Sequence, residues 1–155
     1  MGTFYTNARI ELLGDRKKAV EIPKLLVDTG AEFTWVNGAT LSKLGVSREK
    51  KDYTFVTATG QQITRAVGFA IIRVGDTFTV DEVVFGEPGD LELLGARSLE
   101  GLNLRVDSRA KKLVAGGPIL AAVGKKTLVE NNPTLRDGDS MADKAQKVVK
   151  TVAAR

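Results

Sequence analysis

The sequence contains no histidine and no cysteine among its 155 residues. Without these side chains the chain cannot form a Ser-His-Asp triad, a Cys-His pair or a Cys/His zinc site. Any chemistry must therefore use carboxylates, hydroxyls, lysines or backbone groups, and we expect neither a metal nor another cofactor. The lack of cysteine also suits a reducing compartment, and we expect a cytoplasmic protein.

Long hydrophobic runs and a strong charge imbalance are also missing. The longest apolar candidate, residues 119–123, is far shorter than the roughly 18 residues that a membrane-spanning helix needs. The formal net charge is +4, but residues 125–155 hold seven basic and four acidic residues, which leaves 16 basic and 15 acidic before them. The main part of the chain is therefore nearly neutral, and we expect a soluble protein without a membrane or nucleic-acid partner.

The composition is that of one globular domain with a tail. Hydrophobic residues make up 43% and charged residues 27%, and the 16 glycines favour many turns over long helices. A chain of this length can bury a hydrophobic core without the help of disulfide bonds or a structural metal ion. We expect a mainly all-β domain over residues 1–124, followed by a polar linker and a possible C-terminal helix over residues 125–155.

Alternating apolar residues and turn signals predict short strands at intervals of about 8 to 12 residues, as in a sandwich or barrel. Two strands over residues 3–13 and 19–27 share a tight turn, and residues 53–59 and 63–74 form a hairpin around Gly60. Short helices are expected over residues 38–45 and 96–101. The remaining strands are predicted over residues 78–85, 91–94, 102–106 and 112–114.

The sharpest chemical signal is Asp28, which directly follows the apolar run Leu25-Leu26-Val27 and precedes Thr29-Gly30-Ala31. A carboxylate at the end of a buried strand loses solvation, and two such groups facing each other would share one proton. A symmetric pair can hold one water, one carboxylate taking its proton while the other gives a proton to a peptide carbonyl. The alternative is a turn aspartate that caps its own backbone.

Four features in order resemble the retropepsin-like (clan AA) aspartic proteases, in particular their small single-domain prokaryotic type. They are Asp28-Thr29-Gly30-Ala31 after a hydrophobic strand, Trp35-Val36, the hairpin region of residues 57–62, and Leu93-Leu94-Gly95. The resemblance covers residues 4–114. It implies a closed acid-protease β-barrel with one or two short helices, and a homodimer with its active site on the two-fold axis.

The resemblance also implies roles for single residues. Asp28 would be the catalytic carboxylate, and Thr29 would hydrogen-bond across the dimer to brace the active-site loop. Gly30 would accept contacts from the substrate backbone, and Ala31 completes the loop. A hairpin flap would close over the substrate, a supporting triplet would hold the loop, and an ion pair between Glu32 and Arg97 is possible. The flap residues are Thr57, Ala58, Thr59, Gly60, Gln61 and Gln62, and the supporting residues are Leu93, Leu94 and Gly95.

Two of these features have plainer interpretations. A lone glycine-bearing turn such as residues 60–62 is more often an inert hairpin, and Trp35 is more often a core residue than a substrate contact.

Only one Asp-Thr-Gly is present, so a second carboxylate must come from an identical chain. Residues 116–123 are the candidate segment for sealing that interface. The sequence thus predicts an aspartic endopeptidase that acts on a peptide or protein substrate. The alternative is a weak or inactive peptide-binding or dimerisation module of the same fold.

Overall fold

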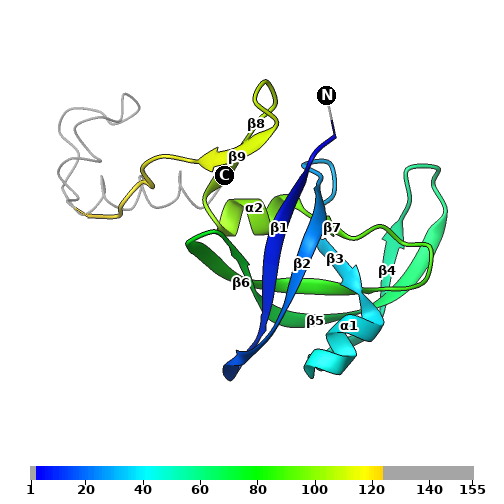
Figure 1. Cartoon of the computed structure of the whole chain (residues 1–155). Helices are drawn as coiled ribbons and strands as arrows, with labels where there is room; N and C mark the ends of the chain where they lie inside the picture. Colours follow the sequence, from blue (N-terminus) through cyan, green and yellow to red (C-terminus); the bar gives the residue numbers. More distant parts are fainter. Residues whose placement is uncertain (1–2, 124–155) are drawn as a thin grey trace, which may run out of the picture. The chain divides into compact units, whose positions relative to one another are not determined.

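The structure is a computed structural model, and it describes residues 3–123 (Figure 1). The chain divides into two compact units, Met1–Gly117 and Pro118–Arg155. The strands, helices and candidate site described below belong to the first unit. The linker and helix predicted for residues 125–155 lie outside the described residues.

The described residues form nine strands and two short helices. The helices are α1 (Gly38–Leu44) and α2 (Ala96–Gly101). The strands are β1 (Tyr5–Leu12), β2 (Asp15–Val27), β3 (Thr34–Asn37), β4 (Lys50–Val56), β5 (Gln62–Val74), β6 (Thr77–Gly86), β7 (Leu93–Leu94), β8 (Leu104–Asp107) and β9 (Lys112–Ala115).

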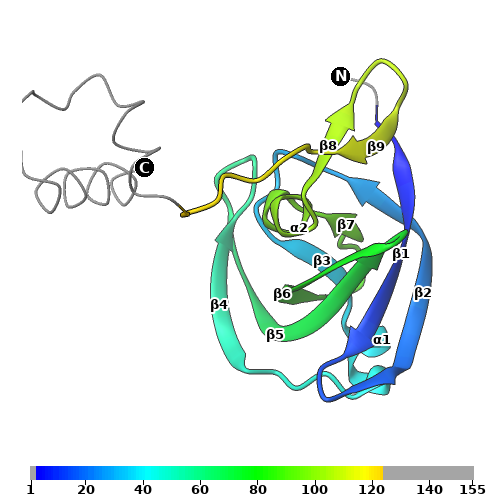
Figure 2. The ribbon, with the colours of Figure 1, turned by 90° about the vertical axis from the view of Figure 1, so that its left-hand side faces the viewer.

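Seven strands form one sheet in the order β1-β2-β7-β3-β6-β5-β4, and β1 also pairs with β5. This additional pairing closes the sheet on itself, as the turned view shows (Figure 2). Strands β8 and β9 form a separate two-stranded hairpin. The predicted closed, mainly β fold with two short helices is therefore confirmed.

The closure between β1 and β5 carries a buried ion cluster around Glu11, whose side chain is only 4% exposed. Its carboxylate lies 3.1 Å from the Arg73 guanidinium on β5 and 3.7 Å from those of Arg9 and Arg16. Burial opposes ionisation of Glu11, but the hydrogen bond and charge of Arg73, with the charges of Arg16 and Arg9, lower its pKa. The charged pair Glu11–Arg73 thus joins the two strands where the sheet closes.

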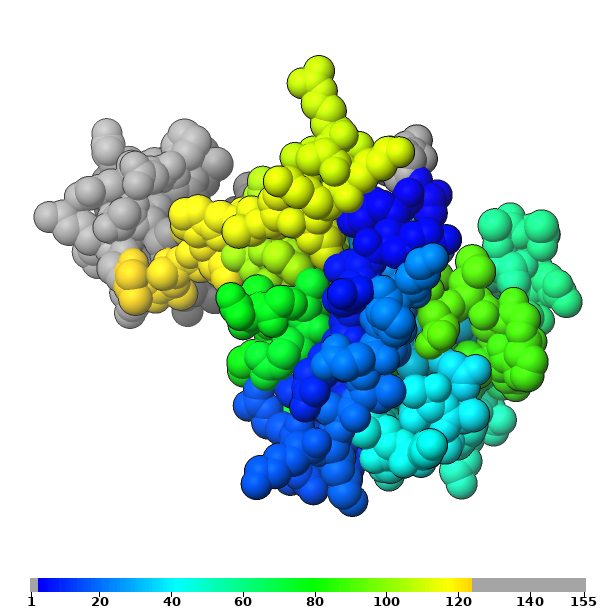
Figure 3. Space-filling model, in the orientation of Figure 1, coloured from blue at the N-terminus to red at the C-terminus, as the bar shows by residue number. Residues whose placement is uncertain are grey.

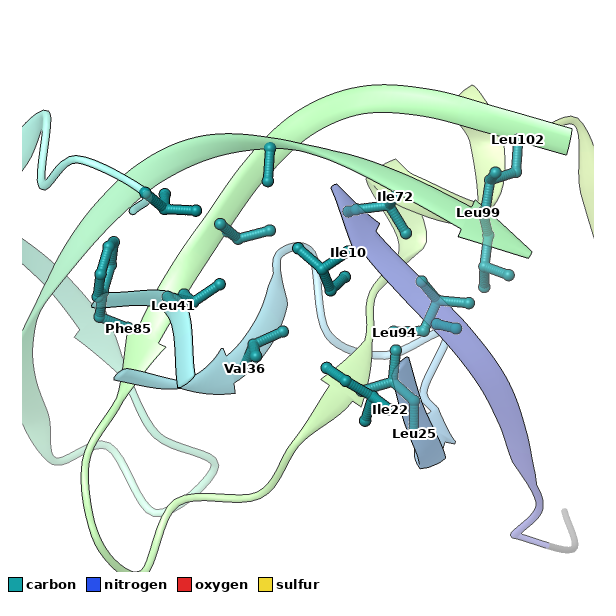
Figure 4. Close-up of a cluster of buried hydrophobic side chains, with 14 of the residues drawn as sticks. Ile10, Ile22, Leu25, Val36, Leu41, Ile72, Phe85, Leu94, Leu99 and Leu102 are labelled. Carbon is teal, nitrogen blue, oxygen red and sulfur yellow. The ribbon is translucent and has the colours of Figure 1, made fainter. Parts of the chain in front are cut away.

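The main core fills the inside of the closed sheet (Figure 4). Alternate residues of the long strands point inward, so β5 contributes Ala66, Ala70 and Ile72, all of them buried. Helix α1 packs Leu41 into the same cluster. The other labelled members of the core are Ile10, Ile22, Leu25, Val36, Phe85, Leu94, Leu99 and Leu102.

Helix α1 begins and ends where the sequence predicts. The Asn37 side chain accepts hydrogen bonds from the N–H groups of Ala39 and Thr40 at 2.9 and 3.2 Å, which caps the first turn. Gly45 ends the helix in the left-handed conformation, with φ of 103°. No helix among residues 3–123 is long and apolar enough to cross a membrane.

Several segments differ from the sequence prediction, among them β4, which covers Lys50–Val56 rather than residues 53–59. Strand β2 begins at Asp15 rather than at residue 19, because Gly14, with φ of 88°, makes a turn tight enough for Leu12 to pair with Asp15. Strand β3 was not predicted as a strand. It has only four residues, and its partners β6 and β7 come much later in the sequence.

Candidate active site

Asp28 is the first residue after β2, and backbone hydrogen bonds hold it there. Its N–H donates to the Leu94 carbonyl at 3.0 Å, which continues the parallel pairing of β2 with β7. The Gly30 N–H donates to Asp28 Oδ1 at 2.9 Å, and the Ala31 N–H donates to the Asp28 carbonyl at 3.3 Å. The bond from Gly30 is the local cap that a turn aspartate makes, and it fixes one carboxylate oxygen of a half-buried side chain.

The Leu93-Leu94-Gly95 triplet lies against the Asp28 loop. Leu93 and Leu94 pair with the end of β2, and Leu93 also lies opposite Trp35 of β3. A Cβ atom at Gly95 would overlap the backbone carbonyl of Phe33, so this close approach requires glycine. Immediately after it, the Ala96 N–H donates to the Ala31 carbonyl at 2.7 Å. The loop is thus held by backbone bonds on both sides of Gly95.

The ion pair expected between Glu32 and Arg97 is not formed among the described residues. The Arg97 N–H donates to the Glu32 carbonyl at 3.1 Å, so the two residues meet through their backbones. The Arg97 guanidinium instead lies 3.5 Å from a Glu82 carboxylate oxygen, and 4.9 Å above the centre of the Phe33 ring. Helix α2 directs this side chain toward β6, and this orientation corrects the prediction.

An open groove of about 720 Å³ lies beside the Asp28 loop. One wall is formed by the segment that follows Asp28, and another by the β4–β5 hairpin. The chain between β6 and β7 completes it, and Figure 3 shows this segment next to the hairpin at the right of the view. The lining residues are Gly30, Ala31, Glu32, Phe33, Trp35, Tyr53, Thr54, Phe55, Val56, Thr57, Ala58, Ile63, Gly89, Asp90, Leu91 and Leu93.

Four aromatic side chains join β3 to the hairpin beneath this groove. The Phe33 ring meets Tyr53 and Phe55 with centroid distances of 5.6 and 5.4 Å, and Trp35 meets Phe55 at 5.0 Å. Edge-on and tilted contacts at these distances are favourable. A second hydrophobic cluster consists of Phe33, Val67 and Val84. The half-buried Trp35 packs against this cluster and also lines the groove.

The tip of the β4–β5 hairpin is a hydrogen-bonded turn over Thr57 to Gln61. The Thr57 N–H donates to the Gln61 carbonyl at 2.8 Å, and the Thr57 hydroxyl oxygen accepts from the Gln61 N–H at 3.1 Å. Gly60 has φ of 85° and open space around it, which suits a glycine. Of the six predicted flap residues, Thr57 and Ala58 line the groove. The hairpin is confirmed, while closure over a substrate stays a prediction.

Thr29 is exposed and lies between two smaller hollows. One, of about 370 Å³, is lined by Thr29 with residues of α2 and β8, such as Leu99 and Leu104. The other, of about 230 Å³, is lined by Asp28 and Thr29 with Phe4 and Val106. Asp28 therefore lines the second hollow, while the residues that follow it, Gly30 and Ala31, line the groove.

The segment proposed to seal a dimer, residues 116–123, forms neither strand nor helix in the single chain. Its large apolar side chains are exposed: Ile119 by 77%, Leu120 by 79% and Val123 by 73%.

The wall formed by the β6–β7 connection is held by a charged pair. Asp90 accepts two hydrogen bonds from the Arg65 guanidinium, at 2.7 and 3.0 Å, and a third from the Glu87 N–H at 2.7 Å. The Arg65 hydrogen bond, aided by that of Glu87 and the Arg65 charge, lowers the Asp90 pKa against the effect of burial. The same pairing raises the pKa of Arg65.

Several residues around the site were not found by sequence reasoning. The Arg65–Asp90 pair joins residues 25 positions apart, and the aromatic cluster joins β3 to β4. The alternation of apolar and polar residues could assign Phe33, Tyr53 and Phe55 to strand faces. It could not show that these side chains lie opposite one another. Within the described residues no group of three or more His, Cys, Asp or Glu side chains is placed to hold a metal ion.

A family model described as "gag-polyprotein putative aspartyl protease" matches residues 20–101. This match spans more than half of the chain and includes Asp28, the β4–β5 hairpin and the Leu93-Leu94-Gly95 triplet. The chain belongs to this family of aspartyl proteases. The resemblance to retropepsin-like proteases is thereby confirmed.

Solved structures of the same kind are also similar. A retropepsin-like aspartic protease from Rickettsia conorii is 28% identical, with a TM-score of 0.47, over 69% of this chain and 77% of that one. The Simian Foamy Virus (mac) protease is 22% identical, with a TM-score of 0.41, over 62% of this chain and 91% of that one. A search of curated proteins found no match.

Proposed function

We propose that the protein is an aspartic endopeptidase whose active site forms when the Asp28 carboxylates of two copies meet. The observation that carries this proposal is the place of Asp28. Asp28 follows a buried strand, where its N–H bonds the Leu94 carbonyl and its carboxylate accepts from the Gly30 N–H, and the residues after it line a groove with aromatic and aliphatic side chains. The family to which the chain belongs consists of aspartyl proteases.

The proposed chemistry needs only the two carboxyl groups and one water. Two carboxylates at short range share one proton, because both cannot ionise there. The ionised Asp28 takes a proton from the water, and the water oxygen attacks the peptide carbonyl carbon. At the same time the protonated Asp28 donates its proton to the carbonyl oxygen. The C–N bond then breaks as the Asp28 that took the water proton gives it to the nitrogen, while the other Asp28 takes a proton back from a hydroxyl of the tetrahedral intermediate, which restores the shared proton. The products are a carboxylic acid and an amine.

Features of the single chain support the dimer. The chain carries one Asp-Thr-Gly, so a dyad requires a second copy, and a two-fold interface brings identical surfaces together. The hollows beside Thr29 and the apolar side chains of Ile119, Leu120 and Val123 are surfaces that such an interface can cover. In the dimer, Thr29 would brace the paired loops.

The groove supports an extended peptide as substrate. It is lined by the two-stranded β4–β5 ribbon and by residues Gly30 to Phe33, and the rings of Trp35 and Phe55, which contact each other, line it too. The hairpin tip, Thr57 to Gln61, would cover a peptide lying in the groove as a flap. We place this activity in the cytoplasm, where a chain without cysteine meets no redox constraint.

The test is cleavage of fluorescently labelled casein and of a peptide library between pH 3 and pH 8, a range of about five units that spans the titration of carboxylate pairs. Wild type is expected to cleave, and Asp28→Asn to lose at least about 100-fold, because general acid–base catalysis contributes that much.

Asp76→Asn is the matched control, since Asp76 lies in an exposed turn and Asp76-Thr77 is not followed by glycine. It should keep wild-type activity. Absence of cleavage by dimeric wild type at every pH, with peptides still bound, would instead favour a peptide-binding module.

A further inference from the structure

A buried series of hydrogen bonds runs from Gly95, at the end of β7, to strand β6. The Gly95 N–H donates to the Thr34 hydroxyl oxygen at 3.0 Å, and the Thr34 and Ser98 hydroxyls are 2.5 Å apart. The Ser98 hydroxyl donates to Asp81 Oδ2 at 2.8 Å. Four segments are connected in this way: the end of β7, β3, α2 and β6.

The direction of every bond in this series follows from the number of protons available. The one proton of the Ser98 hydroxyl goes to Asp81, so the short bond between the hydroxyls must use the proton of Thr34. The Thr34 oxygen is then free to accept from Gly95. All dipoles point from the Gly95 N–H toward the Asp81 carboxylate, an arrangement in which each bond strengthens the next.

The burial of the two hydroxyls argues for a specific purpose. Thr34 and Ser98 are both fully buried, and Glu11 is the only other buried polar residue among residues 3–123. A buried hydroxyl is costly unless it is hydrogen-bonded, and apolar residues of similar size would fill the same space. Here each hydroxyl donates once and accepts once, and no buried side-chain polar atom in the described part of the chain lacks a partner.

Position 81 requires a carboxylate rather than an amide. Asp81 Oδ2 accepts from Ser98, while Oδ1 accepts from the Glu82 N–H at 2.7 Å. An asparagine has a single acceptor oxygen, so it would leave one of these two donors without a partner.

The first bond of this series, at the Gly95 N–H, fixes the peptide group to which the proposed catalytic aspartate is hydrogen-bonded. The Gly95 N–H and the Leu94 carbonyl belong to the same peptide group, and that carbonyl accepts the hydrogen bond from the Asp28 N–H. Because a peptide group is planar and trans, fixing the direction of its N–H also fixes the direction of its C=O. The hydroxyl chain therefore sets where Asp28 is anchored.

We infer that Thr34, Ser98 and Asp81 are positioning residues for Asp28, acting through the Leu94–Gly95 peptide. They touch neither the groove nor the Asp28 carboxylate, so they are not catalytic residues. The catalytic consequence rests on the proposed function. The anchoring itself does not, and it can be measured in a protein without turnover.

The test compares Thr34→Val, which keeps the shape and removes the hydroxyl, with Thr34→Ser, which keeps the hydroxyl and removes a methyl group. Ile72→Val is the stability control, because it removes one methylene from a fully buried site on β5, outside the hydrogen-bond chain. Amide hydrogen exchange of Asp28 and Gly95 is measured by NMR in the full chain, and kcat and KM are measured on labelled casein.

In Thr34→Val, the Asp28 and Gly95 amides should exchange about tenfold faster relative to the core amides, as expected when a hydrogen bond is weakened. kcat should fall roughly 10- to 100-fold, the scale of a small misplacement of a catalytic group, while KM changes less than about twofold. Thr34→Ser and Ile72→Val should keep kcat and the protection of the Asp28 amide.

The inference is overturned if the Asp28 amide is as protected in Thr34→Val as in Ile72→Val, or if Thr34→Ser loses kcat to the same extent as Thr34→Val. If Thr34→Val does not fold, Ser98→Ala, which removes the middle hydroxyl, is judged by the same two measurements. If wild type cleaves nothing, the proposed function fails, while the amide exchange still decides the anchoring.

Discussion

At the scale of single residues, the place of Asp28 after a buried strand could be predicted because its signal is local, while its catalytic role stays a proposal. An apolar run, an acidic residue and a small-residue turn are adjacent in the chain, and the structure places the carboxylate where that run ends. The residues that anchor it could not be found in the same way. Thr34 and Ser98 are 64 positions apart, and each reads as an ordinary small polar residue in its own segment.

The charged pair Arg65–Asp90 gives a prediction about pH at this scale. The Asp90 pKa is lowered in the folded protein, so its ionisation stabilises the fold above the unfolded pKa of about 3.9. This contribution is lost as the pH falls through the lower, folded pKa. Wild type should therefore lose this part of its free energy of unfolding only below about pH 4.

Asp90→Asn should lower the free energy of unfolding at pH 7 by about 1.5–3 kcal/mol, the range for hydrogen bonds to charged groups. The variant should also show a shallower loss of stability below about pH 4. Urea unfolding at a series of pH values measures both effects, with the exposed Asp76→Asn as control. Coincident curves for wild type and Asp90→Asn would show that the pair contributes nothing.

At the scale of elements, the long strands and the two helices were predictable because periodicity and capping residues lie within each element. Strand β3 was missed because four residues carry almost no alternation, and its place depends on β6 and β7. The hairpin of β4 and β5 was predicted from Gly60, but its anchorage was not. That anchorage is tertiary: Tyr53 and Phe55 pack on Phe33, which precedes β3.

The aromatic cluster predicts that the hairpin is firm at its base. Phe55→Ala should lower the free energy of unfolding by about 1–3 kcal/mol, less than for a fully buried phenylalanine because Phe55 is half-buried. The amides of β4 should exchange faster, and KM for labelled casein should rise as the groove wall loosens. Val56→Ala, next in sequence but 67% exposed, is the control and should change neither stability nor exchange. Equal effects of the two substitutions would contradict an anchoring role for Phe55.

At the scale of the whole molecule, the closed sheet was predictable in class, but the strands and side chains that close it were not. Closure depends on β1 pairing with β5 and on the buried Glu11–Arg73 pair, whose members are 62 positions apart. The proposed dimer belongs to this scale as well. Its surface includes the exposed Thr29, where a bulky charged side chain would collide with the facing loop of the second copy, whether or not that copy carries the substitution.

Thr29→Arg should therefore be monomeric in sedimentation at concentrations where wild type is dimeric, with an unchanged far-UV circular dichroism spectrum. This substitution supplies a control for mixing experiments. The double variant Asp28→Asn/Thr29→Arg can neither form the dyad nor pair with wild type.

The most direct test of a site made from two Asp28 carboxylates is casein cleavage by a fixed amount of wild type mixed with increasing amounts of Asp28→Asn. Random pairing with a ninefold excess should leave roughly one tenth of the wild-type chains paired with each other, so cleavage should fall about tenfold. The double variant should leave cleavage unchanged. Cleavage that stays constant as Asp28→Asn is added, under conditions where the two chains form mixed dimers, would contradict a shared active site.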